Sequence, residues 1–377
     1  MTRAPRAALV SVVAALALVS ACRSRSQDAS PPPSSSPPPS SSSPSADVTP
    51  AEAAGLSAAP KLPGALYFRV GDGLAKLADG VFVTDFAVAD AQLFPSEYAL
   101  PDGRVVGIAS TGTGEAGSEQ LVLIGPGTAI ERIGPANTQV RNPAVDPAGT
   151  WIAIESKVEP HSELYRIDLA TQQATRLTDN AQGNFTPAVL DGKSIVFASS
   201  RDGDSEIYKL DLATKQPTRL TAFHRDDWSP RPSPDGPKRS KTIAFLSDRE
   251  GPAHIFLVDA DGTHLRRLTT DADEEAEPTW SPDGTSIAFT RAGKLVVRDV
   301  AHTGSAPRER VLTPADARDA EPAWSRDGAW IAVTRTPKRA GSSGSAVSDI
   351  WAIPLAGGEP VAVTSGGTAR LPRWHER

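Results

Sequence analysis

One short motif recurs along the chain at a regular interval, and this repetition constrains the fold more than any other feature. The clearest copies are EPTWSPDG, ending at Gly284, and EPAWSRDG, ending at Gly328. Weaker copies end at four earlier glycines, so the repeat glycines are Gly103, Gly149, Gly192, Gly236, Gly284 and Gly328. Successive glycines are 46, 43, 44, 48 and 44 residues apart. Such steps indicate one structural unit copied along the chain.

Each repeat has the same internal order of expected strands. An apolar strand follows the Asp-Gly pair, then an Ile-Tyr-like strand such as 206–211, then a short strand such as 218–221. Asp-Gly is a strong hairpin signal, and alternating β-branched residues suit a pleated surface. Four strands per repeat predict a propeller blade, which must stack on its neighbours around an axis. We expect Trp280, Trp324 and Trp351 to fill the seams between blades.

The two ends of the repeat region complement each other. Residues 65–69 form an expected strand with no turn before it, and residues 371–374 form one with no strand after it. Joined, they predict a further blade with one C-terminal strand and three strands from residues 65 to 86. Closure of this kind removes open sheet edges. We therefore predict an all-β fold, a single seven-bladed propeller over residues 62–377, with six blades as the alternative.

The N-terminus has the pattern of an export signal. Arg3 and Arg6 precede thirteen small or apolar residues, 7–19, which are too few to span a bilayer. The run Val19-Ser20-Ala21-Cys22 resembles the bacterial lipobox, whose cysteine receives a diacylglyceryl group, and Cys22 is the only cysteine. We predict a signal peptide at 1–21 and a lipid anchor at Cys22 on the periplasmic or cell-surface face of a bacterial membrane. The alternative is an ordinary signal with a stray cysteine.

Residues 31–50 contain eight prolines and eight serines. A segment of this composition buries little apolar surface and is expected to be a solvated spacer. The expected organisation is therefore a signal peptide at 1–21, a lipidated disordered linker at 22–61, and a propeller at 62–377.

Composition and missing motifs exclude several functions. The net charge of −6 and the absence of a Lys/Arg stripe argue against a nucleic-acid partner. A single cysteine excludes an internal disulfide and multi-cysteine metal sites. The sequence has no GxSxG or HExxH motif, and the GxGxxG match at 112–117 joins two expected strands and opens no helix. We expect no catalytic residues, no cofactor and a monomer.

The PxWSPDG, IAF, IYxxD and RxLT sequences together resemble the WD40-like repeat of TolB-type propellers and of prolyl oligopeptidase propellers. The resemblance covers residues 62–377 and implies a propeller whose channel takes a peptide terminus or a charged strand. TolB proteins carry a small α/β domain before the propeller, where this chain has its proline- and serine-rich segment. The description that fits is an envelope lipoprotein with a TolB-like propeller.

Acidic residues crowd before several inner strands, where a propeller brings its loops to one mouth of the channel. Two arginines follow repeat prolines on strands expected to line the axis. The predicted binding residues are Asp227, Arg231, Asp273, Glu274, Glu277, Glu321 and Arg373. Paired carboxylates there could bind a cation or act in acid–base catalysis. Loops that merely solvate one end are the alternative.

A weaker candidate site lies in the turn at 201–206, where carboxylates stand at alternate positions as they do in calcium loops. The candidate ligands are Asp202, Asp204 and Glu206. A solvated hairpin is the alternative, because the downstream bidentate glutamate of a full EF-hand loop is missing.

These observations predict a non-catalytic lipoprotein, tethered to a membrane, whose propeller binds an envelope protein or peptide. One alternative is an envelope hydrolase or lyase that uses the acidic channel residues. Another is a propeller that binds wall carbohydrate.

Overall fold

The chain folds into β-strands alone over the residues that the computed structural model describes. These are residues 60–375 apart from 87, 89–90, 113–116, 126, 136–138, 158–160, 181, 235–240, 301–307 and 339–346. The predicted signal peptide, Cys22 and the linker up to residue 59 lie outside them. No helix in the described part is long and apolar enough to cross a membrane.

Twenty-eight strands are present in these residues. The first fourteen are β1 (Ala65–Val70), β2 (Gly73–Ala78), β3 (Val81–Phe86), β4 (Gln92–Ala99), β5 (Val105–Thr111), β6 (Ser118–Ile124), β7 (Ile130–Arg132), β8 (Val140–Val145), β9 (Trp151–Ser156), β10 (Glu163–Asp168), β11 (Ala174–Arg176), β12 (Asn184–Asp191), β13 (Ser194–Ser199) and β14 (Glu206–Asp211). The others are β15 (Pro217–Arg219), β16 (Asp227–Pro232), β17 (Thr242–Ser247), β18 (His254–Asp259), β19 (Arg266–Arg267), β20 (Glu275–Trp280), β21 (Ser286–Arg291), β22 (Lys294–Asp299), β23 (Glu309–Val311), β24 (Ala317–Trp324), β25 (Trp330–Pro337), β26 (Asp349–Pro354), β27 (Val361–Ala362) and β28 (Ala369–His375).

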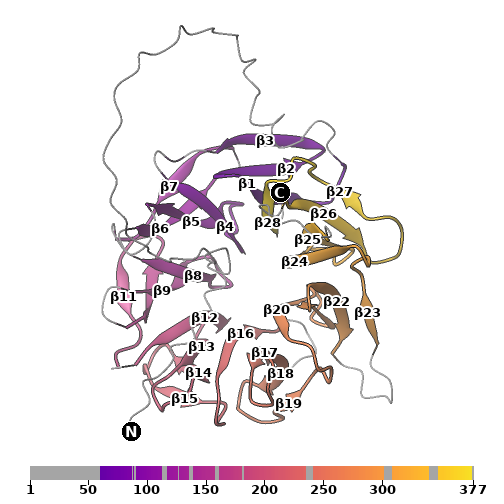
Figure 1. Ribbon diagram of the computed structural model, residues 1–377. Coiled ribbons are helices and arrows are strands. Elements are labelled where there is room, and N and C mark those ends of the chain that lie inside the picture. Colours follow the sequence, from indigo (N-terminus) through magenta and orange to yellow (C-terminus); the bar gives the residue numbers. More distant parts are fainter. Residues whose placement is uncertain are drawn as a thin grey trace, which may run out of the picture. The chain divides into compact units, whose positions relative to one another are not determined.

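These strands form seven four-stranded antiparallel sheets, arranged as blades around a central axis (Figure 1). Blades 1 to 6 are β4–β7, β8–β11, β12–β15, β16–β19, β20–β23 and β24–β27. The closing blade has the order β28-β1-β2-β3. The innermost strands are β28 and the first strand of each other blade, and neighbouring inner strands contact one another around the ring. The prediction of seven blades is therefore confirmed.

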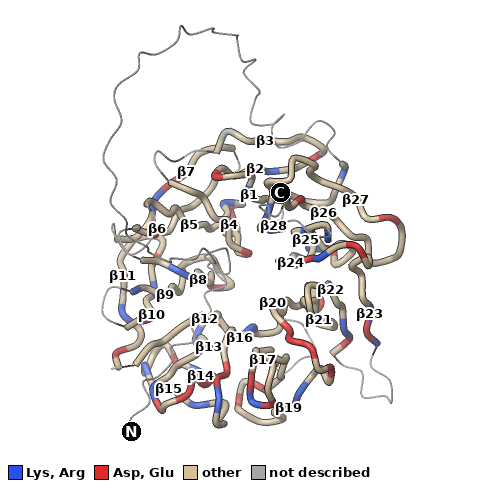
Figure 2. Tube along the Cα trace, in the orientation of Figure 1, with Lys and Arg blue, Asp and Glu red and all other residues tan. Residues whose placement is uncertain are grey.

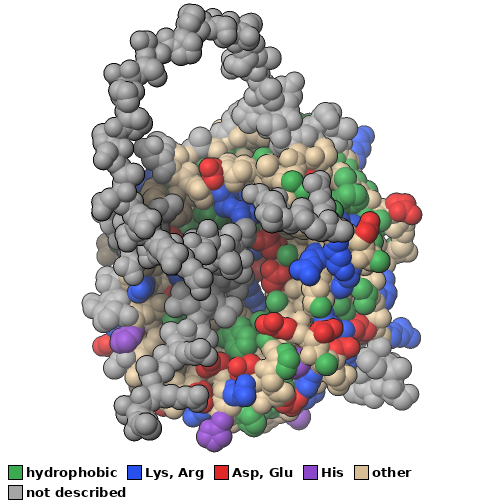
Figure 3. Space-filling model, viewed as in Figure 1, with side chains coloured by type: hydrophobic (Ala, Val, Ile, Leu, Met, Phe, Trp, Pro, Cys, Tyr) green, Lys and Arg blue, Asp and Glu red, His purple; other side chains and the backbone are tan. Residues whose placement is uncertain are grey.

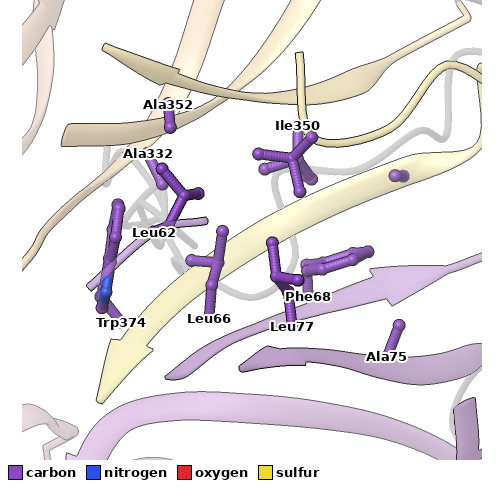
Figure 4. Close-up of a cluster of buried hydrophobic side chains, with 11 residues drawn as sticks. Leu62, Leu66, Phe68, Ala75, Leu77, Ala332, Ile350, Ala352 and Trp374 are labelled. Atoms are coloured by element: carbon purple, nitrogen blue, oxygen red, sulfur yellow. The ribbon is translucent and has the colours of Figure 1, made fainter. Parts of the chain in front are cut away.

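The ring is closed by the pairing of the last strand with the first. Strand β28 runs antiparallel to β1, with His375 opposite Ala65 and Ala369 opposite Val70. The Trp374 side chain packs with Leu66 in the seam against blade 6 (Figure 4). Its indole N–H donates to the carbonyl oxygen of Pro63 at 2.5 Å. The predicted complementarity of the two ends is confirmed.

The repeated turn motif follows from local hydrogen bonding. In blade 5, the Ser281 hydroxyl donates to Asp283 Oδ1 at 2.6 Å and accepts from the Ser286 N–H at 2.9 Å. Gly284 has a φ of 59°, a left-handed conformation that glycine adopts readily. The turn therefore needs serine, aspartate and glycine at these spacings.

The threonine of the RxLT motif joins the third and fourth strands of a blade. Thr221 Oγ1 accepts from the Ile207 N–H at 2.9 Å and donates to Glu206 Oε2 at 2.7 Å. Both donors and the carboxylate are buried, so each would be costly if left unpaired. The same arrangement recurs at Thr178 with Glu163 and at Thr364 with Asp349. Thr313 accepts from the Leu295 N–H in the same way but donates to Asp319 on the inner strand of the next blade.

Tryptophan side chains fill the seams between blades, as predicted. The Trp280 indole N–H donates to the Arg231 carbonyl of blade 4 at 2.8 Å, and that of Trp324 donates to the Thr279 carbonyl of blade 5 at 3.2 Å. Trp351 packs against the cluster shared by blades 5 and 6. Each of the two inner-strand tryptophans is thereby fixed by the blade before it.

Candidate functional site

A β-bulge interrupts every inner strand. In six of them the residue before the repeat proline has a positive φ between 47° and 59°; these residues are Asn142, Thr186, Ser229, Glu277, Glu321 and Leu371. A left-handed conformation at a residue other than glycine costs about 1–3 kcal/mol, so neighbouring groups must stabilise it.

At three of these six residues, a carboxylate of the preceding blade accepts a hydrogen bond from the backbone N–H. Glu277 Oε2 accepts from the Glu321 N–H at 2.8 Å, and Glu321 Oε2 accepts from the Leu371 N–H at 2.7 Å. Glu155 Oε2 of blade 2 accepts from the Thr186 N–H of blade 3 at 3.1 Å. Burial, together with the charge of Glu321, raises the pKa of Glu277. Two of the predicted binding residues, Glu277 and Glu321, therefore link blades 5, 6 and the closing blade.

The other predicted acids do not form one cluster. Asp227 is fully buried and pairs with Arg249 through Oδ2 and Nη2 at 2.6 Å. Burial raises the pKa of Asp227 to about 6. Asp273 and Glu274 are exposed just before β20. Of the five predicted carboxylates, these two alone are fully open to solvent at the entry of the inner strands.

The calcium candidate does not assemble a metal site. The Glu206 carboxylate is buried and accepts from Arg219 at 2.6 Å, from Thr221 at 2.7 Å and from the Phe223 N–H at 2.5 Å. Asp202 accepts from the Tyr208 hydroxyl. No group of three or more His, Cys, Asp or Glu residues in the described chain could hold a metal ion. The turn is therefore a hairpin in which two of the three candidate ligands, Asp202 and Glu206, already bind protein donors.

An ion pair crosses the channel. Arg231 of blade 4 donates through Nη1 to Glu97 Oε1 of blade 1, and β4 and β16 lie on opposite sides of the axis (Figure 2). Desolvation opposes the ionisation of Glu97, but the guanidinium groups of Arg231 and Arg373 outweigh it and lower its pKa. Desolvation and the Glu97 charge raise the pKa of Tyr98 above its ordinary value. Arg231 therefore spans the channel to a partner, Glu97, that the sequence analysis did not identify.

Arg373 holds the corresponding position on β28, directly after Pro372. It is half-buried, and its Nη1 donates to the Pro372 carbonyl at 2.8 Å. Among the described residues it forms no ion pair. Its prediction as a channel-lining residue agrees with its place in the pocket described next.

A pocket of about 800 Å³ lies at the end of the channel where the inner strands finish. Its walls carry three tryptophans and four prolines, namely Trp280, Trp324, Trp374, Pro101, Pro147, Pro282 and Pro322. Its charged or titratable residues are Glu97, Asp102, Asp146, Arg326, Arg373 and His375. In Figure 3, acidic and basic side chains lie side by side around the central depression of the face in view.

The carboxylates of the pocket are already engaged. Asp146 accepts from the N–H groups of Ala148, Thr150 and Trp151 at 3.1, 2.5 and 2.8 Å. Asp102 pairs with the Arg104 guanidinium at 2.7 Å, and Glu97 pairs with Arg231. Asp102 and Glu97 are therefore paired with cations, and Asp146 accepts hydrogen bonds from uncharged backbone groups.

His375 is uncharged at neutral pH. Burial lowers the pKa of this residue to about 4. Its Nε2 lies 3.0 Å from the carbonyl oxygen of Ser96, which can only accept, so Nε2 carries the proton. This bond joins the closing blade to blade 1.

Glu97 is the residue that sequence reasoning missed, although the spacing contains a signal. Pro95 precedes Gly103 by eight residues, whereas Pro278 precedes Gly284 by six. Counting back six residues from Gly103 therefore places Glu97, not Pro95, at the position of the motif proline. The extra length lies in the bulge of β4, between Pro95 and Ala99.

The sequence matches the profile of the TolB beta propeller domain over residues 115–239 and 211–350. The chain belongs to this family. The match confirms the TolB-like character that the repeats suggested, and together with the seven blades it defines the domain as a TolB-type propeller. Among curated proteins, no sequence matches the chain significantly.

Solved structures with a similar fold have diverse functions. TolB from Acinetobacter baumannii is 22% identical, with 83% of this chain and 67% of that one covered and a TM-score of 0.49. An oligogalacturonate lyase from Vibrio parahaemolyticus is 14% identical, with coverages of 81% and 85% and a TM-score of 0.57. A puromycin-hydrolyzing peptidase from Mycobacterium tuberculosis is 13% identical, with coverages of 86% and 56% and a TM-score of 0.57. At these identities the likeness concerns the fold alone.

Proposed function

We propose that this TolB-type propeller belongs to an exported lipoprotein, anchored through Cys22, that binds a protein or peptide of the cell envelope without catalysing a reaction. The observation that carries the proposal is the pocket of about 800 Å³ at the end of the channel. Its walls combine indole and pyrrolidine rings with charged side chains, a mixture that suits both the side chains and the polar groups of a peptide. The anchor and the proline- and serine-rich segment would hold this pocket away from the membrane surface.

The non-catalytic character rests on the state of the acidic side chains. Glu277 and Glu321 accept backbone hydrogen bonds from the next blade, and Asp227 pairs with a buried arginine. A general acid or base must reach a substrate proton, which these bonds hinder. Their roles in the ring account for their positions without a reaction.

An envelope hydrolase or lyase is the second candidate, because three titratable groups with shifted pKa values adjoin the pocket. These are Glu97, Tyr98 and His375, and such shifts are common at active sites. If the chain is an enzyme, Glu97→Gln should abolish turnover of a substrate found by screening peptides and acidic oligosaccharides. If it is a binding protein, no such turnover will be detected with the unaltered chain.

Photocrosslinking in intact cells tests the binding function. We expect benzoylphenylalanine at Ala323, on the pocket wall, to capture a discrete envelope protein or peptide. The same group at Val81, which is 60% exposed on β3, is the control and should not capture that product. Equal products from both positions, or none from Ala323, would contradict the proposal.

The anchor is tested by fractionation. We expect the unaltered chain to sediment with membranes and to incorporate labelled fatty acid, whereas Cys22→Ser should remove the label and release the chain from the membrane. Membrane retention of the unlabelled variant would show that another segment anchors the protein.

A further inference from the structure

From the balance of charge in the pocket, we infer that it recognises the free C-terminal carboxylate of a peptide through Arg373, with an apolar last side chain against the tryptophan wall. The inference rests on the proposed binding function and specifies its ligand. It narrows the expectation from the sequence, in which the channel takes a peptide terminus or a charged strand, to a single kind of terminus.

The charged groups of the pocket favour an anionic ligand. Within the pocket, Glu97 is paired with Arg231, Asp102 with Arg104, and Asp146 with three backbone N–H groups. Arg373 donates to one backbone carbonyl and pairs with no carboxylate among the described residues. Its guanidinium has five N–H donors, and a carboxylate can accept two of them side by side. The pocket therefore offers a cation to an incoming anion.

Three tryptophans form a fixed surface beside Arg373. Arg373 lies next to Trp374 on β28, and the inner strands of the two preceding blades add Trp280 and Trp324 to the pocket lining. The indole N–H groups of all three tryptophans are bound to backbone carbonyls at 2.5 to 3.2 Å, so their rings are fixed before a ligand arrives. A fixed aromatic wall loses little conformational entropy when it binds an apolar side chain.

The carboxylates of the pocket favour a peptide over an acidic sugar as the ligand. Sugar hydroxyls need several free acceptors, and carboxylates are the usual ones. In this pocket the carboxylates are occupied by protein donors, and proline and tryptophan supply much of the wall. The Glu97–Arg231 pair also spans the channel beside the pocket and links blades 1 and 4. A ligand chain would meet this pair on the axis, which favours a terminus over an internal segment.

The test uses the detergent-solubilised full chain and N-acetylated pentapeptides that end in Phe, Leu or Gly, each as a free acid and as an amide. Calorimetry should show the Phe and Leu acids binding at least tenfold more tightly than their amides and than the Gly acid. Arg373→Gln should reduce the acids to the affinity of the amides. The matched control is Arg370→Gln, which removes the same charge from the same strand outside the pocket lining and should leave the acid preference intact.

Several results would overturn the inference. Equal affinity for the acid and the amide would exclude recognition of the carboxylate. An equal effect of Arg373→Gln and Arg370→Gln would mean that the peptide acid is attracted only by long-range charge and not bound by Arg373. Tighter binding of a galacturonate oligomer would indicate an acidic sugar instead. Peptide binding that ignores the terminus would leave the proposed binding function standing, whereas failure of the Ala323 crosslink would remove that function itself.

Discussion

At the scale of single residues, His375 shows how the ring turns an ordinary titratable group into a structural one. Its ring is almost fully buried and packs edge-on against Tyr67 at a centroid distance of 5.5 Å. The hydrogen bond from Nε2 to the Ser96 carbonyl requires the proton on that nitrogen but no charge. Protonating the second nitrogen would place a charge in this enclosed site, which explains the lowered pKa of about 4.

We expect this histidine to make the fold less stable in mild acid. The unfolded chain has the ordinary histidine pKa of 6.5 and takes up the proton first, so stability is complete above pH 6.5 and falls as the pH drops toward 4. The loss amounts to about 3 kcal/mol. Urea unfolding at pH 7 and pH 4 should show the stability difference between the unaltered chain and His375→Gln shrinking by this amount. A difference that does not change with pH would contradict the assignment.

At the scale of strands, the RxLT threonine shows what a repeated motif contributes to a blade. Thr221→Val keeps the shape of the side chain but leaves the Ile207 N–H and one oxygen of Glu206 without this partner. We expect a loss of about 1–3 kcal/mol in the free energy of unfolding. The matched control is Thr218→Val, which is exposed on the neighbouring strand and should change stability by less than about 0.5 kcal/mol. Equal effects would mean that side-chain shape, not the hydrogen bond, matters at Thr221.

Contacts within one turn can be predicted from the sequence, whereas contacts between blades cannot. The turn serine, aspartate and glycine act within a few residues of one another, so their pattern predicts the strands and their spacing. The role of Glu277 depends instead on a backbone N–H 44 residues away, exposed by a bulge in the next blade. The Arg231–Glu97 pair joins residues 134 positions apart. No local pattern describes such partners, so the sequence does not predict that Glu277 and Glu321 link neighbouring blades.

At the scale of the whole molecule, stability depends on the pairing of β28 with β1. A chain truncated after Thr368 loses this strand together with the Trp374 side chain from the seam of blade 6. We expect a fall in Tm of more than about 10 °C, because the last seam loses its packing and β1 becomes an open edge. A synthetic peptide of residues 369–375 should bind to the truncated chain and restore much of the loss, whereas a peptide of scrambled order should not. An unchanged Tm after truncation would show that the ring does not need this strand.

The order of strands also has a consequence for biosynthesis. Strand β1 is among the first of the ring to leave the ribosome, and its partner β28 is the last. Six blades can form from neighbouring segments as they emerge, but the remaining blade stays one strand short until β28 has been made. A nascent chain that stalls late would expose the backbone of β1 to other proteins for as long as it waits.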